Sequence, residues 1–562
     1  ASVGKAAESW AIEHGWPVIY KNIGPLFLAK GAELCREGGR VAMLQPATAL
    51  LATRSGNAER FRTRMFTTLA VEEVVNLAAF RAILFPNAAA PVCSIVLRPV
   101  APDGAPVVYI CPKPTGTAED YQRIAIEKDD VHLVPVADAI GDPSIWAVLM
   151  WGGPRDLALV RRLRRLPSLE KIEAGGGASS REGVIRGRKE QRHEPFVLGK
   201  RMLGKQFPSD GLLRLNASSL PVNVDPMVHR RDSVDFSAFA APQLLIKQSW
   251  LKDSARFAAR IVDNSDGKAV LCSQSYVSVT VKPWLRRYLD SACLTYNSVL
   301  AVYYLLLSSG RFAFERAEAL KEELMRVPIP DPRFGMLRDL HNATDIDERV
   351  SDLLGLKPAE RVLVEDLIRY TLPDYKHSTR KAYRGDIPPS PGRRRTIRTT
   401  SDGEIEPELE AYCEQFLRVF DTGLEAENVC ATIFQEAAGG RLPVRMVAIH
   451  LDWPGHSKRV RLEPMGTSGL VELLTGLDRM LSGANPEQGG VFYRRVARAY
   501  HHVQADGRKV PTVYLIKPDQ IRYWTRSSAL READEVAADA FRWAQDAGPG
   551  GVASLSTSPS NE

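Results

Sequence analysis

The residues best suited to chemistry in this sequence are cations that follow a glycine run. The segment from Arg181 to Lys205 holds eight Lys or Arg residues against three Glu. Flexible cationic side chains bind nucleic-acid phosphates without reading sequence, so the stretch predicts a contact with a DNA backbone. A solvated charged loop would have the same composition. The candidate DNA-binding residues are Arg186, Arg188, Lys189, Arg192, Lys200, Arg201 and Lys205.

Two further polar residues lie in QLLIKQSW (243–250), a run with the composition of a strand. Gln can pair bidentately with adenine, and Lys can donate to guanine. Lys247 and Gln248 are therefore candidate base contacts.

Nuclease and metal chemistry is not indicated. The nearest match to a phosphodiesterase motif, HSKRVRLE from His456, ends in Glu and has no second copy. No Asp…Glu-x-Lys constellation lies on adjacent strands. His456 and the pair His501-His502 do not stand at metal-ligand spacing with carboxylates, so no metal site is predicted.

The bulk composition describes a chain of several ordinary globular domains. Its 562 residues exceed what one core supports, and 44% are hydrophobic and 25% charged. The seven cysteines are scattered without a CxxC pair, which fits a reducing cytoplasm. The formal charge of +7 is compatible with nucleic acid but does not require it.

Two further classes of segment are not expected. No run approaches the ~18 apolar residues of a membrane span, so no membrane partner is expected. The first residues, ASVGKAAESW, show no signal peptide and lack a Met, which suggests a trimmed or partial chain.

The first 110 residues alternate between strand and helix patterns, which predicts an α/β sheet. Helices are expected in IGPLFLAKGAELC and from Asn57 to Thr68, and strands in RVAMLQP, VEEVVNL and PVCSIVLRP. The last two strands are too close for a helical crossover and should be antiparallel neighbours. SACLTYNSVLAVYYLLLSSG predicts one apolar core helix, and EAGGGASS (173–180) a flexible break.

Changes in composition and in hydrophobic pattern along the chain predict seven segments. They are a first α/β segment (1–110), a connecting region (111–180), a mixed α/β block (181–335), a charged helical segment (336–385), a basic Pro-rich linker (386–404), a C-terminal α/β domain (405–545) and a disordered tail (546–562).

Several ordered motifs in the first 100 residues resemble the second half of the catalytic domain of adenine-N6 DNA methyltransferases. The resemblance is to the restriction–modification and phage-defence type, whose recognition domain follows catalysis. It rests on YKNIGPLFLAKGAEL with Phe27 and Leu28, on GGRVAMLQPATALL, on ERFRTRMF, on VEEVVNL, and on LFPNAAAPVCSIVLRP. Gly38-Gly39 would make the tight turn from helix to strand.

The resemblance implies a partial Rossmann-like methyltransferase sheet followed by a target-recognition domain over 181–335. It implies that Phe85, in the hairpin before the last strand, packs against a flipped-out adenine; a core role for Phe85 is the alternative. It also places Asn297-Ser298 at a helix start with a structural role. Double-stranded DNA is the implied substrate.

The acceptor motif Asn-Pro-Pro-aromatic and the Gly-rich loop for S-adenosylmethionine do not occur in the sequence. The resemblance therefore implies a transferase fragment, inactive alone, with S-adenosylmethionine bound mainly by a missing N-terminal half or partner subunit. A truncated sheet also predicts an exposed edge near residues 36–46. One alternative is a non-catalytic DNA-binding specificity subunit; a less favoured one is a restriction subunit with a nuclease in 405–545.

The C-terminal domain has a Lys-Pro…Tyr-Trp…Ala-Leu…Ala-Asp pattern that resembles the tails of large bacterial methylases, to which we attach no activity. Lys517, Asp519, Arg522 and Trp524 could form a DNA-contacting strand edge. We favour a core aromatic with surface charges.

Overall fold

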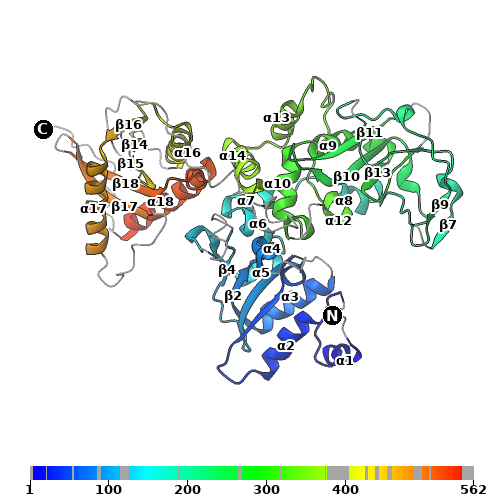
Figure 1. Ribbon diagram of the computed structural model, residues 1–562, viewed down its shortest axis with the longest axis horizontal. Helices are drawn as coiled ribbons and strands as arrows, with labels where there is room; N and C mark the ends of the chain where they lie inside the picture. Colours follow the sequence, from blue (N-terminus) through cyan, green and yellow to red (C-terminus); the bar gives the residue numbers. More distant parts are fainter. Residues whose placement is uncertain are drawn as a thin grey trace. The chain divides into compact units, whose positions relative to one another are not determined.

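The computed structural model describes residues 4–20, 22–52, 56–84, 90–113, 124, 126–187, 190–208, 211–263, 269–314, 318–373, 375, 404–423, 428–436, 442–451, 453, 458–484, 497–505 and 508–546. Two compact units make up the chain (Figure 1). The N-terminal unit comprises Ala1–Pro114, Ile124–Ile368 and Tyr375–Asp386, and the C-terminal unit comprises Thr115–Arg123, Arg369–Asp374 and Ile387–Glu562. Both units are mixed α/β, as predicted.

The N-terminal unit begins with a five-stranded mixed sheet in the order β1-β3-β2-β4-β5. The strands are β1 (Val41–Pro46), β2 (Ala70–Asn76), β3 (Val92–Arg98), β4 (Val107–Ile110) and β5 (Val131–Val134). β3 is antiparallel to both β1 and β2, β2 is parallel to β4, and β4 is antiparallel to β5. The antiparallel pairing of the second and third predicted strands is confirmed, and so is the edge position of β1.

Helices cover one face of this sheet. The helix α2 (Gly24–Leu34) packs on β1, and α3 (Gly56–Thr68) packs on β2. The helix α5 (Val136–Gly141) contacts α3, and α1 (Lys5–Glu13) precedes α2 in the chain. On that face Ile95, Val74 and Tyr109 lie side by side across three strands and are buried. Gly31 of α2 lies so close to β1 that a Cβ there would sit 3.0 Å from Met43 Cε. The turn into β1 needs glycine, because Gly38 has φ +72°.

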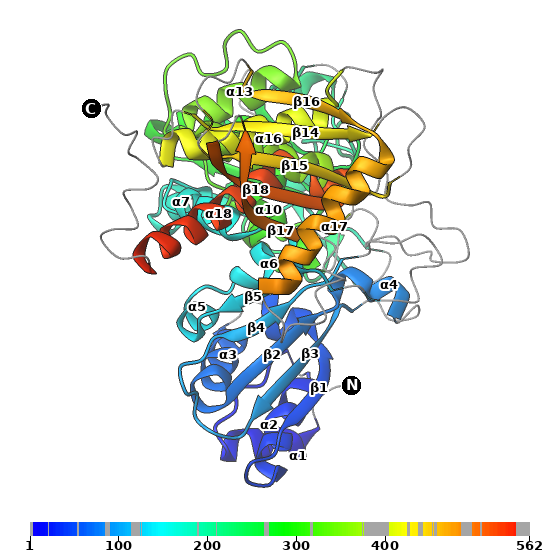
Figure 2. The ribbon, with the colours of Figure 1, turned by 90° about the vertical axis from the view of Figure 1, so that its left-hand side faces the viewer.

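The other face of the same sheet is mostly apolar and half-exposed. Alternation places Leu44, Ser94, Val75 and Ile110 there in one row, and Val96, Glu73, Val108 and Leu133 in the next, so Ser94 and Glu73 interrupt the apolar surface. Leu44 is 58% exposed and Leu133 is 66% exposed. Figure 2 turns this face to the viewer, with α2 and α3 behind the strands.

Three helices follow the sheet, and the first of them, α6 (Ile145–Trp151), packs against its buried face. The other two are α7 (Pro154–Leu163) and α8 (Leu169–Ala174). The Trp146 ring stacks on Phe66 of α3 and meets Tyr109 edge-on at 5.1 Å. The predicted flexible break at 173–180 is wrong, because these residues end α8, turn, and begin β6 (Ala178–Glu182). The glycines occupy that tight turn.

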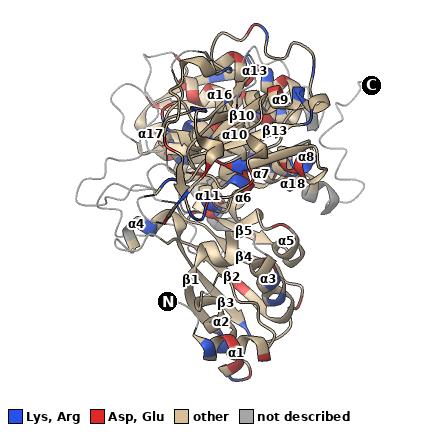
Figure 3. Ribbon diagram, turned by 90° about the vertical axis from the view of Figure 1, so that its right-hand side faces the viewer, with Lys and Arg blue, Asp and Glu red and all other residues tan. Residues whose placement is uncertain are grey.

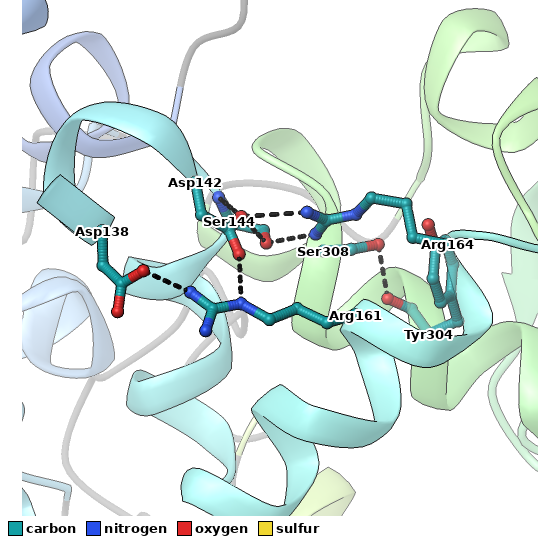
Figure 4. A network of polar contacts seen from close by, with 7 residues as sticks. All are labelled: Asp138, Asp142, Ser144, Arg161, Arg164, Tyr304 and Ser308. Carbon is teal, nitrogen blue, oxygen red and sulfur yellow. Dashed lines mark hydrogen bonds and ion pairs between the residues drawn. The ribbon is translucent and has the colours of Figure 1, made fainter.

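Ion pairs tie α5 to α7 (Figure 4). The Asp142 carboxylate accepts from the Ser144 hydroxyl at 2.6 Å and from Arg161 and Arg164 at 3.1 and 3.0 Å. Burial alone would raise the pKa of Asp142, but Ser144 and the two guanidiniums outweigh it and hold that pKa at about 2. Arg161 also reaches Asp138 at 2.8 Å. Tyr304 and Ser308, from a later helix, lie beside this network.

A second, antiparallel sheet forms the middle of the N-terminal unit, in the order β11-β10-β13-β6. Its other strands are β10 (Gln243–Leu251), β11 (Arg256–Val262) and β13 (Tyr276–Val281). Two short pairs flank it: β7 (Gln191–His193) with β9 (Met227–His229), and β8 (Arg201–Met202) with β12 (Val270–Leu271). Helices α9 (Arg287–Tyr296), α10 (Val299–Ser308), α11 (Arg311–Phe314) and α12 (Lys321–Met325) complete it.

The single apolar helix predicted for 291–310 is wrong in one respect, since α9 and α10 meet at 78°. The Asn297 side-chain amide donates to the carbonyls of Ala259 and Cys293 at 2.7 and 2.8 Å, which ends α9. The Val299 N–H at the start of α10 donates to Asp347 at 2.9 Å. The predicted structural role of Asn297-Ser298 therefore agrees with these contacts.

Among the described residues no single helix is long and apolar enough to cross a membrane, and the bent pair α9–α10 meets that test by length and composition only.

The N-terminal unit ends with α13 (Ala343–Leu353), α14 (Pro358–Asp366) and η9 (Leu367–Thr371), of which η9 crosses into the C-terminal unit. The predicted linker over 386–404 lies outside the described residues except for its last position, and the predicted tail from 547 onward lies outside them entirely.

The C-terminal unit is a five-stranded sheet in the order β16-β14-β15-β18-β17 with helices on both faces. The strands are β14 (Cys430–Glu436), β15 (Val444–His450), β16 (Val460–Met465), β17 (Ala497–Ala505) and β18 (Arg508–Pro518). α16 (Pro407–Gly423) and α18 (Arg526–Asp546) cover one face, and α17 (Thr467–Ala484) covers the other.

Candidate nucleic-acid interface

The basic stretch belongs to a folded excursion between β6 and β10. Val184, Val197, Leu203, Leu215 and Val228 are buried together at its core. The described cationic side chains of the stretch therefore stand on a folded scaffold. Lys and Arg positions are interspersed with Asp and Glu positions over the unit (Figure 3).

Two of the predicted arginines are held by partners within the chain. Arg186 donates to Asp225 at 2.8 Å and to the Asn223 side chain at 2.6 Å. Arg192 donates to the Ser233 carbonyl at 3.1 Å and lies 3.6 Å from the Glu194 carboxylate. Their charges are partly offset by these acids, so they are the weaker phosphate ligands of the set.

The cations later in the stretch have fewer acidic partners within the described chain. Arg201 donates to the Leu220 carbonyl at 2.5 Å. The Lys200 ammonium lies 4.4 Å from the centre of the Phe196 ring, and Lys205 is exposed. Neither lysine forms an ion pair with a carboxylate of the described chain. Arg188 and Lys189 lie outside the described residues.

Replacing Lys200 and Lys205 together by Gln is expected to weaken DNA binding and flatten its salt dependence. Each lost phosphate contact lowers the slope of log K against log salt by about 0.9, so the double variant should lose about 1.8. Fluorescence anisotropy of a labelled duplex at several salt concentrations measures this slope. Arg186→Gln is the matched control, since its charge already meets Asp225. Equal slopes for the wild type and the double variant would contradict the assignment.

Lys247 and Gln248 lie on β10, where Lys247 is opposite Tyr276 in the β13 ladder. The Gln248 amide donates to the Glu182 side chain at 2.8 Å. Lys247 is half-buried and makes no ion pair within the described residues. Base contacts by these two residues stay a prediction.

Phe85 lies outside the described residues, which resume at Ala90. Ala90 and Pro91 line a pocket of about 200 Å³ at the carboxyl end of β1. Its other walls are Ile19, Tyr20, Asn22, Pro46, Thr48 and Ala49. The volume suits one planar ring system rather than a drug-sized ligand. The sequence analysis missed this pocket, although Gln45-Pro46 at a strand end marks its position.

Two amide side chains meet beside the pocket. A Cβ on Gly24 would lie 2.9 Å from Gln45 Oε1 and 3.2 Å from Asn22 Oδ1, so only glycine allows this approach. Asn22 Oδ1 accepts the Gly24 N–H at 2.9 Å, which fixes the amide and leaves its NH₂ without a bond to a described residue. Buried Gln45 Oε1 likewise has no hydrogen-bond partner in the described chain. The pocket thus combines mostly apolar walls with one amide side chain, that of Asn22, whose NH₂ makes no hydrogen bond to a described residue.

The C-terminal residues singled out from sequence form a core. Trp524 is buried, as predicted, but Lys517 is fully buried and not a surface charge. Its ammonium lies 2.6 Å from Glu532 and donates to the Tyr523 carbonyl at 2.7 Å. The rings of Tyr412 and Trp524 flank it at 4.0 and 4.2 Å. The reason is period-two alternation: Val513, Leu515 and Lys517 share the face toward α16 and α18.

The other two members of that set are also engaged. Asp519 accepts from Arg445 at 3.0 Å, and the Arg522 guanidinium lies 4.5 Å from the Tyr523 ring.

A buried histidine links three strands of the C-terminal unit. His450 lies 2.9 Å from Thr432 through Nε2 and 3.0 Å from Thr512 through Nδ1. Thr432 accepts from Arg461 at 2.6 Å. A neutral ring that donates through Nδ1 satisfies all of these contacts. Burial, and then the Arg461 charge, lower the pKa of His450 to about 3.

Acidification is expected to destabilise the C-terminal unit through His450. The His450 ring takes up a proton near pH 6.5 in the unfolded chain but only near pH 3 in the folded chain. The contribution of the neutral ring to the free energy of unfolding is therefore complete above pH 6.5 and is lost as pH falls toward 3. The slope is at most about 1.4 kcal/mol per pH unit. Urea unfolding of wild type and His450→Gln from pH 7 to 4 measures it. The stability difference between the two should shrink with acid; a constant difference would contradict the burial argument.

Among the described residues no group of three His, Cys, Asp or Glu side chains is arranged to hold a metal ion. His456 lies outside these residues, and only the backbone of His501-His502 is described.

No family model matches the sequence, and no curated protein matches it. Two solved structures show low similarity. One is the type IIL restriction-modification enzyme MmeI in complex with DNA, at TM-score 0.35 and 11% identity, covering 67% of this chain and 55% of that one. The other is the HsdS subunit from Thermoanaerobacter tengcongensis, at TM-score 0.17 and 14% identity, covering 61% of this chain and 97% of that one. The chain thus spans about half the length of MmeI. Similarity this low assigns neither fold nor function.

Proposed function

We propose that this chain is the C-terminal portion of an adenine-N6 DNA methyltransferase of the restriction–modification type. Its first sheet would supply the last strands of the catalytic domain, and residues 181–335 would recognise DNA. The observation that carries the proposal is the sheet itself. The motifs GGRVAMLQP, VEEVVNL and PVCSIVLRP become β1, β2 and β3 of one sheet, with ERFRTRMF in the helix α3 that connects β1 to β2.

The edge of this sheet supports a missing half. Within the described chain β1 pairs with β3 alone, so its outer backbone groups have no strand partner. Native edges are usually blunted by charge, proline or a covering element. Here Ala42 and Leu44 are exposed, and Pro46 comes only at the end. An edge of this kind fits one or more further strands.

The half-exposed face of the first sheet supports the same proposal. Sheets of doubly wound α/β domains carry helices on both faces. The row of Leu44, Ser94, Val75 and Ile110 is mostly apolar, and among the described residues this face of the sheet stays half-exposed. The other half of a methyltransferase domain would bring both the strands for the edge and helices for this face.

The pocket at the end of β1 would receive the flipped adenine. Its walls are apolar, and the Asn22 amide offers N–H donors to an acceptor nitrogen of a base. Phe85, which lies outside the described residues, is proposed from the family resemblance to replace the stacking that the base loses on leaving the duplex. Lys200 and Lys205 would hold the DNA backbone.

S-adenosylmethionine is proposed to bind mainly to the other half. The acceptor tetrapeptide and the Gly-rich loop are absent from this sequence, and the described pocket offers one amide and no carboxylate. The chemical step of methyl transfer is therefore assigned to residues of the other half.

The test is to read the frame upstream of the codon for Ala1 and to co-express any half that carries the acceptor tetrapeptide. The combined protein should transfer labelled methyl groups from S-adenosylmethionine to duplex DNA, whereas this chain alone should not. A specificity subunit would instead bind DNA with no methylation in either form. That result, with no acceptor motif upstream or in an adjacent frame, would remove the enzyme proposal.

A further inference from the structure

Two large aromatic side chains are about three quarters exposed on the N-terminal unit. Trp284 is 75% exposed and lies in η8 (Pro283–Leu285), between β13 and α9. Phe334 is 74% exposed and lies in the loop between α12 and α13. Isolated exposed apolar residues are common, so exposure alone says little about either ring.

Cations accompany both rings. The Lys282 ammonium lies 5.4 Å from the Trp284 ring centre. The guanidiniums of Arg287 and Arg338 lie 5.5 and 5.0 Å from the Phe334 ring centre. Arg287 thus brings the start of α9 against a loop about fifty positions later in the chain. We call these five residues the aromatic–basic patch.

The charges of the patch are not neutralised within the described chain. Lys282, Arg287 and Arg338 form no ion pair with a described carboxylate, whereas neighbouring Arg286 is bound to Asp263 at 2.6 Å and Asp290 at 3.1 Å. The exposed acids of the same loop, Asp331 and Asp339, are not ion-paired to the patch either. Three cations beside two flat apolar faces therefore remain available to a ligand.

Each nucleotide of an unpaired strand offers what this surface can bind. Its base has a π face for an aromatic ring, and its phosphate suits a nearby Lys or Arg. A duplex hides the base faces, so stacking on open rings favours unpaired chain. A membrane surface fits less well, because interfacial binding needs an amphipathic helix with a broad apolar face.

The patch is separate from the basic stretch at 186–205. In the β6–β13 ladder, Ala178 lies opposite Val281 and Glu182 lies opposite Val277. The patch follows Val281 at one end of this ladder, and the basic stretch follows Glu182 at the other end.

We infer that the aromatic–basic patch binds unpaired nucleic acid, with Trp284 and Phe334 stacking on bases and Lys282, Arg287 and Arg338 contacting phosphates. The inference rests on the patch alone and does not require the chain to be part of a methyltransferase.

The experiment is anisotropy titration of the full chain with a labelled single-stranded oligonucleotide of about 16 nucleotides, together with Trp fluorescence quenching. Trp284→Ala and Phe334→Ala should each weaken binding by about 5- to 150-fold, since a base stacked on an aromatic contributes about 1–3 kcal/mol. Phe541→Ala, at an exposed aromatic of the C-terminal unit, is the matched control and should bind like wild type. Arg338→Gln should lower the salt slope, and Lys357→Gln should not.

Three outcomes would overturn the inference. One is single-strand binding that the two aromatic substitutions leave unchanged. Another is duplex binding that responds to Arg338→Gln but to neither aromatic substitution. The third is binding to anionic lipid vesicles with none to the oligonucleotide. Circular dichroism of each variant separates loss of binding from loss of fold. Failure here leaves the methylation test untouched, because that test reads methyl transfer by the combined protein.

Discussion

A Lys517→Met variant is expected to lose about 3–5 kcal/mol of stability in the C-terminal unit, the range seen when one partner of a buried ion pair is removed. Lys517 is fully buried and stands 2.6 Å from Glu532. Its removal leaves the Glu532 carboxylate in the core, where the Tyr412 hydroxyl still donates to it. Urea unfolding of the full chain, followed through the transition of the C-terminal unit, measures the loss.

Two further variants test whether the loss comes from the unpaired Glu532 carboxylate. Lys517→Met combined with Glu532→Leu should recover most of the loss, because an apolar replacement of a whole buried pair is often neutral. Exposed Lys458→Met should change stability by about 0.5 kcal/mol or less. A loss below about 1 kcal/mol for Lys517→Met would mean that the pair is not desolvated as described.

A Leu44→Asp variant is expected to cut methylation by the combined protein at least about 100-fold. If the proposed other half covers β1, a carboxylate at this position is buried without a partner, which costs about 3 kcal/mol or more of assembly free energy. The measurement is methyl incorporation at limiting concentrations of the two halves, with their association followed by analytical ultracentrifugation. Leu44 is 58% exposed in this chain, so the fold of the isolated chain should tolerate the change.

Val471→Asp is the control, at an exposed position of α17 in the C-terminal unit. If the Leu44→Asp variant associates normally with the other half, that half does not cover β1. Normal assembly with lost methylation would point instead to the neighbouring pocket at the end of β1.

The sequence predicted those strands and helices whose formation depends on the local spacing of apolar residues. β1, β2 and β3 alternate or carry β-branched runs, and α3 shows helical spacing, so their positions followed from sequence. The start of β6 was not predicted, because the glycines at 175–177 have a composition that is typical both of a tight turn and of a flexible break. The apolar run of α9 and α10 hid a bend that is fixed by Asp347, nearly fifty residues away.

The environment of the candidate residues could be predicted only in part, because much of it depends on contacts between residues far apart in the sequence. The burial of Lys517 follows from alternation with Val513 and Leu515 and could have been predicted from the pattern. The aromatic–basic patch could not, because Arg287 meets Phe334 through tertiary packing alone. Asp225, which holds Arg186, lies outside the basic stretch, and a count of charges within that stretch could not show the pairing.

The bond from Asp347 to the start of α10 also constrains how the chain can be cut and in what order it folds. Asp347 accepts the Val299 N–H at 2.9 Å and pairs with Arg256 of β11. A polypeptide cut at residue 335 would contain every strand of the second sheet yet lack this carboxylate. Its α10 would begin without its acceptor and Arg256 without its counter-charge. The second sheet and its helices should therefore reach their final form only after α13 has been synthesised and has docked, and a shortened chain should extend past Leu353 to fold cooperatively.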